Sequence, residues 1–361
     1  MRLHPEDCKE SFKNCKAMLH RPVAAKMDPL LQLFNSSFSN KEASGWPSAD
    51  YWDTNSSSTI TASDLSLPEP VNAWDIVLCV TGTVMACENA IVLAILFYTP
   101  SLRAPMFLLI GSLALADLLA GLGLVSNFIV LYVFNTELAI LSSAGLLLTS
   151  FSASVCSLLA ITADRYLSLY NALTYHTERT LTFTYLMLII VWVLCLCIGL
   201  LPVMGWNCVW DQSTCSILKP VTQNYATVLA VSFLLIFAIM MQLYLQICKI
   251  AFRHAQQIAV QHQFMATSQA SSTRKGVSTL SLILGTFAVC WLPFAVYSLV
   301  ADSSYPMVYT YSLVLPVTCN SVINPIIYAF RNPDIQKSLW VACCGCISPS
   351  FSSGPRTSSD V

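Results

Sequence analysis

Residues 138–166 read LAILSSAGLLLTSFSASVCSLLAITADRY, and this stretch decides the fold. No charged residue lies between Leu138 and Ala163. A helix of that length, at 1.5 Å per residue, crosses the roughly 30 Å hydrocarbon core of a bilayer. Charge returns at Asp164-Arg165, followed by Tyr166, so this triplet is expected where the helix reaches the membrane face. An arginine at that position must be paired, hydrated or used.

The rest of the chain has the same apolar character. Of the 361 residues, 55% are hydrophobic and only 10% are charged, far fewer than in a soluble domain. The long spans favour helices over β-barrel strands, which are short and strictly alternating. We therefore predict an all-α membrane protein, a seven-transmembrane helix bundle. The predicted spans are Trp74–Tyr98, Ala104–Phe134, Leu138–Leu169, Phe183–Trp206, Val221–Phe252, Val277–Ala301 and Val308–Phe330.

The lysines and arginines predict the orientation of these spans. One set of loops carries almost all of them, whereas the opposite loops carry only Lys219. The N-terminus is therefore expected outside the cell and the C-terminus inside. The first 26 residues lack an apolar core, so we expect no signal peptide, and the first span serves as its own anchor. No basic block suggests nucleic-acid binding.

Two further regions flank the predicted seven-helix domain of residues 74–331. Residues 1–73 are rich in Ser, Asn, Pro and Asp, which predicts a disordered extracellular tail. Its sequons at Asn35 and Asn55 predict N-glycosylation, and Met27 offers a second start position besides Met1. Residues 332–361 begin with an amphipathic segment, 333–341, which predicts a short cytoplasmic helix 8 before the tail.

The cysteines fall into three groups. Most lie within spans and are expected to be packing residues. Cys208 and Cys215 share an outer loop in an oxidising compartment, so we expect a disulfide that closes this loop on itself. A third group follows the amphipathic segment and suits palmitoylation, with free cytosolic thiols as the alternative. It consists of Cys343, Cys344 and Cys346.

Several polar residues lie inside the predicted spans, where an unpaired polar group is costly. Asp117 is the most exceptional, because it is a carboxylate in the middle of the second span. Two interpretations fit: a hydrogen-bonded contact between helices, or a hydrated site that holds a sodium ion through oxygen ligands. The candidate ligands are Asn89, Asp117, Ser154, Asn320, Ser321 and Asn324. No other cofactor is expected.

Two of the prolines in the last two spans lie within motifs. Pro293, in Cys290-Trp291-Leu292-Pro293, and Pro325, in Asn324-Pro325-Ile326-Ile327-Tyr328, each remove a backbone hydrogen bond and predict a kink. Kinks at these positions can act as hinges.

These motifs, each in its own span and in this order, closely resemble the rhodopsin-like G-protein-coupled receptors. The resemblance covers about residues 74–346. It rests on Asn89, Leu113-Ala114-Leu115-Ala116-Asp117, Asp164-Arg165-Tyr166, Trp192, Cys290-Trp291-Leu292-Pro293 and Asn324-Pro325-Ile326-Ile327-Tyr328. It implies a plasma-membrane receptor that engages a heterotrimeric G protein, with receptor kinases and arrestin as further partners.

Departures from the family pattern indicate a branch. The usual cysteine of span three is replaced by Ile140, the usual proline of span five by Ile236, and Glu88 precedes Asn89 in place of glycine. These traits resemble the lysophospholipid and cannabinoid receptors. Three longer stretches are similar to a small group of orphan receptors with high basal stimulation of adenylyl cyclase through the stimulatory G protein. They are residues 103–108, 199–208 and 273–276.

The resemblance also bears on the ligand. An amine receptor carries a carboxylate where this chain has Leu147, and an opsin carries a lysine where it has Thr318. An apolar cavity would suit an acyl chain, whereas the same aromatics could equally be core packing. The candidate pocket residues are Leu147, Phe151, Trp291, Phe294 and Tyr297.

The expected switch centres on Arg165. It pairs with Asp164 at rest and extends toward Tyr244 and Tyr328 when span six swings outward. Many relatives hold the arginine shut with an acid twenty residues before the proline of span six, where this chain has Thr273. We therefore predict a large basal active fraction. Leu173, in the loop after the triplet, is the expected apolar contact with the G protein.

Two alternatives remain. The receptor could depend strictly on a lysophospholipid or sphingolipid, or the chain could be a transporter or channel, although it lacks inverted repeats. We expect no enzyme, because no nucleophile–base pair appears. The C-terminal Ser359-Asp360-Val361 fits capture by a PDZ domain.

Overall fold

Each predicted apolar span forms a helix in the computed structural model. The structure describes residues 71–99, 102, 104–134, 136–170, 178–261, 267–302 and 304–344. Within these residues, seven helices are long and apolar enough to cross a membrane. They are α3 (Ala73–Tyr98), α4 (Pro105–Ile129) with its π-helical extension η2 (Val130–Phe134), α5 (Glu137–Tyr170), α6 (Glu178–Leu200), α7 (Gln223–Gln261), α8 (Thr267–Val300) and α9 (Met307–Arg331). The all-α prediction is confirmed.

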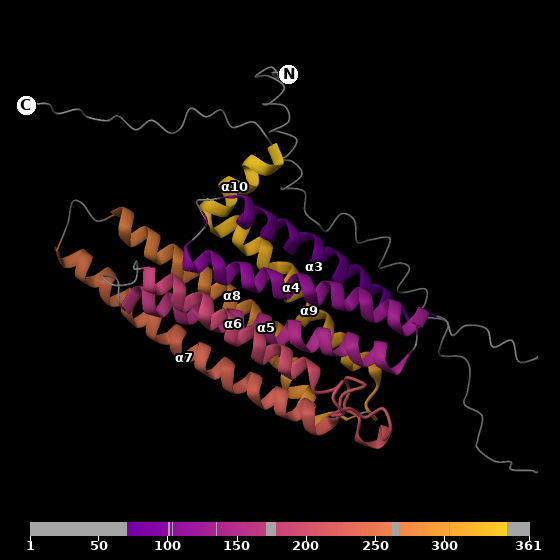
Figure 1. Ribbon diagram of the computed structural model, residues 1–361. Coiled ribbons are helices and arrows are strands. Elements are labelled where there is room, and N and C mark those ends of the chain that lie inside the picture. Colours follow the sequence, from indigo (N-terminus) through magenta and orange to yellow (C-terminus); the bar gives the residue numbers. More distant parts are fainter. Residues whose placement is uncertain are drawn as a thin grey trace, which may run out of the picture. The chain divides into compact units, whose positions relative to one another are not determined.

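The helices run antiparallel from one to the next, so the bundle has two ends (Figure 1). We call the end with the Cys208–Cys215 loop the disulfide end, and the opposite end the Arg165 end. Helix α3 packs on α4 and α9, while α5 lies between α4, α6 and α7. Helix α8 packs on α7 and α9, which closes the bundle.

Three helix boundaries differ from the prediction. Helix α6 ends at Leu200 and not at Trp206, because Pro202 and Gly205, whose φ is +117°, follow it. Helices α7 and α8 extend beyond the membrane-length segments, to Gln261 and from Thr267. The extension of α7 is rich in Ala and Gln, which favour helix without favouring membrane, and the extension of α8 is polar and rich in Ser and Thr.

A short helix follows α9. Helix α10 (Pro333–Cys344) begins after Asn332, whose side chain accepts hydrogen bonds from the backbone N–H groups of Asp334 and Ile335, at 3.0 and 3.3 Å. An asparagine in this position caps a new helix, so α10 leaves the axis of α9 there (Figure 1). It extends past the predicted 341, so Cys343 and Cys344 lie in its last turn and not after it.

Glycines bring two pairs of helices into backbone contact. A Cβ added at Gly121 of α4 would lie 2.5 Å from the carbonyl oxygen of Gly82 on α3. A Cβ added at Gly145 of α5 would lie 2.5 Å from the carbonyl oxygen of Gly199 on α6. Only glycine allows such close packing, which is common between membrane helices.

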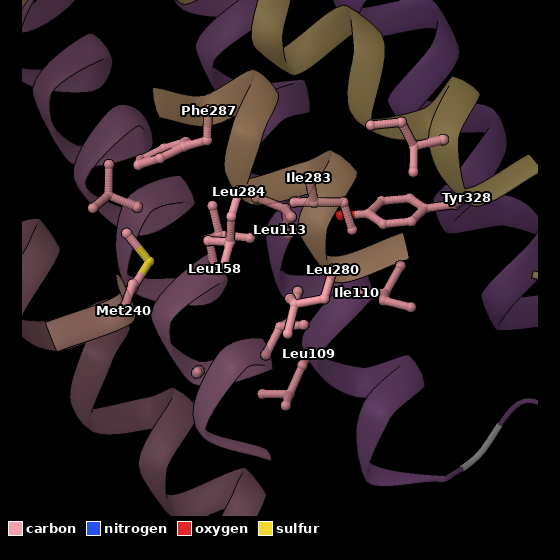
Figure 2. Close-up of a cluster of buried hydrophobic side chains, with 14 of the residues drawn as sticks. Leu109, Ile110, Leu113, Leu158, Met240, Leu280, Ile283, Leu284, Phe287 and Tyr328 are labelled. Carbon is pink, nitrogen blue, oxygen red and sulfur yellow. The ribbon is translucent and has the colours of Figure 1, made fainter. Parts of the chain in front are cut away.

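The main hydrophobic core gathers buried side chains from α3, α4, α5, α7, α8, α9 and α10. Figure 2 shows its centre, where Leu113 of α4, Leu158 of α5, Ile283 of α8 and Tyr328 of α9 converge. Each of these side chains is buried. This cluster packs the parts of α8 and α9 near the Arg165 end against the remaining helices.

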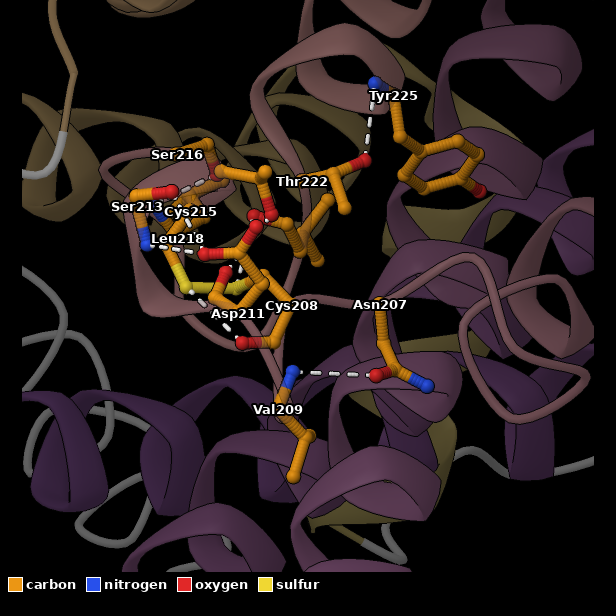
Figure 3. Close-up of a disulfide and its surroundings, with 12 residues drawn as sticks. Asn207, Cys208, Val209, Asp211, Ser213, Cys215, Ser216, Leu218, Thr222 and Tyr225 are labelled. Atoms are coloured by element: carbon orange, nitrogen blue, oxygen red, sulfur yellow. Dashed lines mark hydrogen bonds between the residues drawn. A yellow bond between two sulfur atoms is a disulfide. The ribbon is translucent and has the colours of Figure 1, made fainter.

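The loop between α6 and α7 contains the disulfide. Cys208 and Cys215 are bonded, with their Cα atoms 5.3 Å apart, which confirms the expected bridge within one loop (Figure 3). Asp211 caps the 3₁₀ turn η3 (Gln212–Thr214) between them by accepting a hydrogen bond of 3.1 Å from the N–H of Ser213. The loop is therefore a small folded unit and not an open connection.

The same loop is also joined to the segment that follows α8. Ser216 forms an isolated antiparallel β-bridge with Asp302, just after the end of α8. Hydrogen bonds from the side chain and backbone of Ser304 to Asp302 lower the pKa of that carboxyl below its usual value. Asp302 is thus held charged and fixed beside the loop.

Candidate functional site

A polar cluster surrounds Asp117 in the middle of the bundle. The carboxylate is fully buried and accepts three hydrogen bonds. Ser154 of α5 and Ser321 of α9 donate to Oδ1 at 2.9 and 2.8 Å, and Asn324 of α9 donates to Oδ2 at 2.9 Å. One carboxylate thus links α4, α5 and α9, and Asn324 lies directly before Pro325 of α9.

Asn89 extends this cluster to α3. Its amide nitrogen donates to the backbone oxygens of Met85, at 2.9 Å, and Ser321, at 3.2 Å. Its amide oxygen is buried and has no hydrogen-bond partner among the described residues. Asn320 is also buried. A buried carboxylate, two hydroxyls and an orphan amide oxygen are the hard oxygen donors that a small cation accepts.

The residues proposed for sodium are therefore partly brought together by the structure. Ser154, Ser321 and Asn324 each donate a hydrogen bond to Asp117, and Asn89 joins the cluster through the backbone of Ser321. These contacts also satisfy the plainer interpretation, a hydrogen-bonded helix contact. The ion itself stays a prediction.

A second polar link ties α6 to its neighbours. The indole N–H of Trp192 donates to the hydroxyl of Ser112 on α4 at 3.0 Å. That hydroxyl lies 2.9 Å from the hydroxyl of Ser157 on α5. The chain of three side chains fixes three helices at one height.

An aromatic cluster surrounds Trp291, two residues before Pro293 of α8. Its ring lies 5.4 Å from Phe233 of α7 and 5.7 Å from Phe151 of α5, in stacked and edge-on geometry. Phe287 packs against it one turn earlier on α8, at 5.7 Å. The indole N–H of Trp291 is buried without a hydrogen-bond partner among the described residues.

The predicted pocket residues are distributed over this region. Phe151 and Trp291 touch, whereas Leu147 packs with Phe151 against a separate cluster at Met85. Tyr297 lies nearer the disulfide end, where its ring meets Tyr305 and its hydroxyl lies 3.4 Å from that of Thr310. Phe294 packs on the main core. These contacts are those of core packing, and a lipid pocket stays a prediction.

The Arg165 end holds the expected switch. Asp164 and Arg165 are half-buried near the end of α5, and Ser168 donates to the backbone oxygen of Arg165 at 2.9 Å. The ring of Tyr166 stacks on that of Tyr170 at 5.7 Å. The pairing of Asp164 with Arg165 stays a prediction.

The two tyrosines expected to meet Arg165 have different surroundings. The hydroxyl of Tyr244 on α7 is hydrogen-bonded to Ser281 on α8. Because Ser281 gives its own proton to the backbone oxygen of Val277, at 2.8 Å, Tyr244 is the donor. The hydroxyl of Tyr328 is buried in the apolar core without a partner among the described residues (Figure 2).

Several predicted sites lie outside the part of the chain whose side chains are described. Thr273 is within helix α8, and Cys343 and Cys344 are within α10, without described side chains. The others lie outside the described residues altogether: Asn35, Asn55, Leu173, Cys346, Ser359, Asp360 and Val361.

Sequence reasoning missed two contacts between helices. At the disulfide end, Asp75 of α3 accepts hydrogen bonds from Tyr132 and Tyr311, at 2.7 and 2.8 Å. At the Arg165 end, Arg331 reaches from α9 to α8. In the sequence, both contacts appear only as a charged residue at the end of a span. Many polar residues on other spans could pair with such a residue, so the sequence does not identify the partner.

Comparison with known proteins places this arrangement in a family. The family described as 7 transmembrane receptor (rhodopsin family) matches residues 88–328. The chain is 61% identical over 326 residues to G-protein coupled receptor 12 of Homo sapiens, which covers 88% of this chain and 97% of that protein. It is 55% identical over 295 residues to G-protein coupled receptor 3 of Homo sapiens, covering 82% and 89%. It is 52% identical over 291 residues to G-protein coupled receptor 6 of Mus musculus, covering 81% and 80%.

The comparisons agree with the structure. The chain has relatives of more than 50% identity. It also has a buried carboxylate that joins three helices, the triplet Asp164-Arg165-Tyr166 near the end of α5, and prolines inside α8 and α9. This protein therefore belongs to the rhodopsin family of G-protein-coupled receptors, multi-pass proteins of the plasma membrane that act through heterotrimeric G proteins.

Proposed function

We propose that this receptor couples to the stimulatory G protein and raises cyclic AMP with high activity in the absence of an added ligand. The observation that carries the proposal is the lack of any Asp or Glu between Asp211 and Asp302. Helices α7 and α8, including Thr273, therefore offer no carboxylate to Arg165. A conformational equilibrium of a few kcal/mol shifts strongly when one charged contact is absent.

The contacts of α8 near the Arg165 end support this proposal. Ser281 is hydrogen-bonded to Tyr244, and Ser278 and Thr279 accept hydrogen bonds from Arg331. These are hydroxyl contacts, and a neutral hydrogen bond is weaker than one between two charged groups. The buried hydroxyl of Tyr328 adds a second bias, because moving to a polar partner would recover the cost of its unpaired burial.

The proposal also covers the orientation of the receptor in the membrane, its ligand and a bound ion. The basic residues gather at the Arg165 end, which supports a cytoplasmic position for that end and an extracellular N-terminus. A lipid acyl chain suits the apolar surroundings of Trp291. A sodium ion held by Asp117 and its neighbours would stabilise the negative charge there. The receptor has no catalytic activity of its own in this scheme.

Further partners and modifications are proposed on sequence alone. Arrestin and receptor kinases follow from the family, and the tail after helix α10 offers the phosphorylation sites. The three cysteines near 344 would carry palmitate, and Val361 would enter a PDZ groove. N-glycans at Asn35 and Asn55 would lie on the outer side.

The decisive experiment measures basal cyclic AMP against surface expression for the wild type, Arg165→Ala and Thr273→Glu. We expect Arg165→Ala to abolish the rise and Thr273→Glu to reduce it by pairing with Arg165. Gln269→Glu, which adds the same charge one turn earlier on α8, is the matched control and should change little. If Thr273→Glu leaves basal signalling untouched at equal expression, the argument from the missing acid fails.

A second arm separates intrinsic activity from a response to lipid. Cells kept in delipidated serum should retain the basal signal. If the signal disappears and returns on adding a lysophospholipid or sphingolipid, the receptor is ligand-dependent. Current or solute flux that survived Arg165→Ala would instead indicate a transporter or channel.

A further inference from the structure

A guanidinium bridge joins the ends of α8 and α9 at the Arg165 end. Arg331, in the last turn of α9, donates from Nη2 to the hydroxyl of Ser278 at 2.5 Å. Its Nε donates to the hydroxyl of Thr279 at 3.2 Å. Two adjacent hydroxyls of α8 thus accept hydrogen bonds from two nitrogens of one planar guanidinium group, a geometry that lysine cannot reproduce.

The bridge acts on the same turn of α8 as the contact from α7. Tyr244 is bonded to Ser281, three residues after Ser278. Residues 278–281 are therefore held from one side by a tyrosine of α7 and from the other by an arginine of α9. The turn lies in the half of α8 farther from the disulfide, about three turns after the helix begins at Thr267, so an outward swing of this half would displace it.

The two contacts differ in what protects them. Arg331 and Ser278 are exposed, and Thr279 is half-buried, so the bridge can exchange its partners for water. Tyr244 is half-buried and packs against the main core. A displacement of a few ångströms between α8 and α9 would break both guanidinium bonds, because a hydrogen bond does not persist beyond about 3.5 Å.

We propose that Arg331, together with Ser278 and Thr279, is the restraint that holds the Arg165 end of α8 against α9 in the resting receptor. This inference rests on the proposed function, in which an outward swing of α8 starts signalling. These three are positioning residues that set the population of the resting state. A restraint built from hydroxyls and one exposed guanidinium is weaker than a buried ion pair, so the resting state is only partly populated.

The chemistry predicts how the restraint responds to change. Loss of either side of the bridge should release α8 by the same amount, because the remaining group returns to water. Loss of both sides should add little to the loss of one. Such non-additivity distinguishes a direct contact from two independent effects on the same equilibrium.

The test uses the full chain with two readouts. Basal cyclic AMP per surface receptor is measured in cells for Arg331→Ala, for Ser278→Ala with Thr279→Val, and for the combined variant. Arg331→Lys keeps the charge but not the fork. The matched control is Lys337→Ala, which removes an exposed base from α10 without touching the bridge.

The second readout does not require a G protein. Spin labels at Leu167→Cys on α5 and Leu282→Cys on α8, both at exposed positions, report the separation of the two helices in receptor reconstituted in lipid nanodiscs. The accessible native cysteines are replaced by serine in this background. The outward population is the quantity compared between variants.

We expect Arg331→Ala to raise the ratio of outward to inward α8 about three- to tenfold, the factor that follows from losing one modest hydrogen-bonded contact. Basal cyclic AMP should rise with the outward population. The Ser278 and Thr279 variant should match it, the combined variant should not exceed it, Arg331→Lys should lie between, and Lys337→Ala should equal the wild type.

Three results would overturn the proposal: an unchanged helix separation in Arg331→Ala, additive effects in the combined variant, or a wild-type receptor whose α8 is already fully outward. Failure of the proposed function has a different signature. In that case the wild type gives no basal cyclic AMP, while the labels still report whether Arg331 restrains α8.

Discussion

The hydroxyl of Tyr311 on α9 donates a hydrogen bond of 2.8 Å to the carboxylate of Asp75 on α3. Tyr132 of η2 donates to the other carboxylate oxygen at 2.7 Å, and its hydroxyl also accepts the backbone N–H of Asn72 at 3.1 Å. The ring of Trp74 stacks on that of Tyr311 at 5.8 Å. One acid in the first turn of α3 therefore fastens three helices at the disulfide end.

Tyr311→Phe should lower the stability of the bundle. The substitution keeps the ring and its stacking but removes the donor to a charged acceptor, in a half-buried site. We expect a loss of about 1.5 to 3 kcal/mol, the usual range for hydrogen bonds to charged groups. The thermal unfolding of purified receptor in detergent measures it.

Tyr309→Phe is the control, because Tyr309 lies on the same helix and is 58% exposed. Its melting temperature should equal that of the wild type. A similar loss in both variants would mean that the hydroxyl of Tyr311 contributes nothing specific.

Gly199→Ala should impair folding of the receptor. An added methyl group would meet the side chain of Thr149 and the backbone of Gly145, so α5 and α6 would have to separate. Overpacking of this kind costs typically 1–3 kcal/mol. Surface expression and thermal stability are the measurements, and Gly145→Ala should behave alike.

Gly285→Ala provides the contrast. No atom lies within 4 Å of the position that its Cβ would take. Alanine is favoured over glycine within a helix by up to about 1 kcal/mol, so this variant should be as stable as the wild type or more so. A severe loss in Gly285→Ala would refute the distinction drawn from helix contact.

Asp117→Asn should remove the response of the receptor to sodium. In the wild type, replacing potassium by sodium at constant ionic strength should raise the melting temperature, because a bound cation stabilises the folded state that holds it. The variant keeps the shape of the side chain and loses its charge. Equal sodium responses in both proteins would rule out Asp117 as a ligand.

Ser321→Ala tests the same cluster from α9. It removes one of the donors to Asp117 and one oxygen from the candidate ligand set. We expect a reduced sodium response and a loss of stability of about 1–3 kcal/mol, since a buried charged acceptor then lacks a donor.

Cys208→Ser, Cys215→Ser and the double substitution should be equivalent, because each breaks the same bond. Removing the bond frees the loop between α6 and α7, which we expect to lower surface expression. Cys197→Ser, at an exposed cysteine of α6 that forms no disulfide, should express normally. Unequal single variants would point to a separate role for one of the thiols.

Much of the fold follows from local patterns in the chain. Spans such as 138–169 are long and uncharged, and hydrocarbon accepts no alternative to a helix for such a segment. The helix ends were less predictable, because charge marks where the membrane stops and not where the helix stops. Helix α7 therefore continues to Gln261 through a polar stretch that lies outside the predicted span.

The candidate site was predictable where one residue type could serve only one purpose. Asp117 was such a case, because a carboxylate in mid-membrane needs donors, and these came from Ser154, Ser321 and Asn324. The contact of Asp75 with Tyr311 was not predictable, because 236 positions separate them and tyrosines at span ends are common. Phe233 was missed for a related reason: phenylalanine on a membrane helix can face lipid or core.

The loop bridge between Ser216 and Asp302 gives the disulfide a mechanical meaning. The disulfide between Cys208 and Cys215 closes the loop on itself, and Ser216, the next residue, pairs with Asp302, two residues after the end of α8. A peptide or antibody that gripped this loop would therefore pull on the far end of the helix whose opposite end Arg331 holds. A force on the extracellular loop would then be transmitted through α8 to the cytoplasmic face.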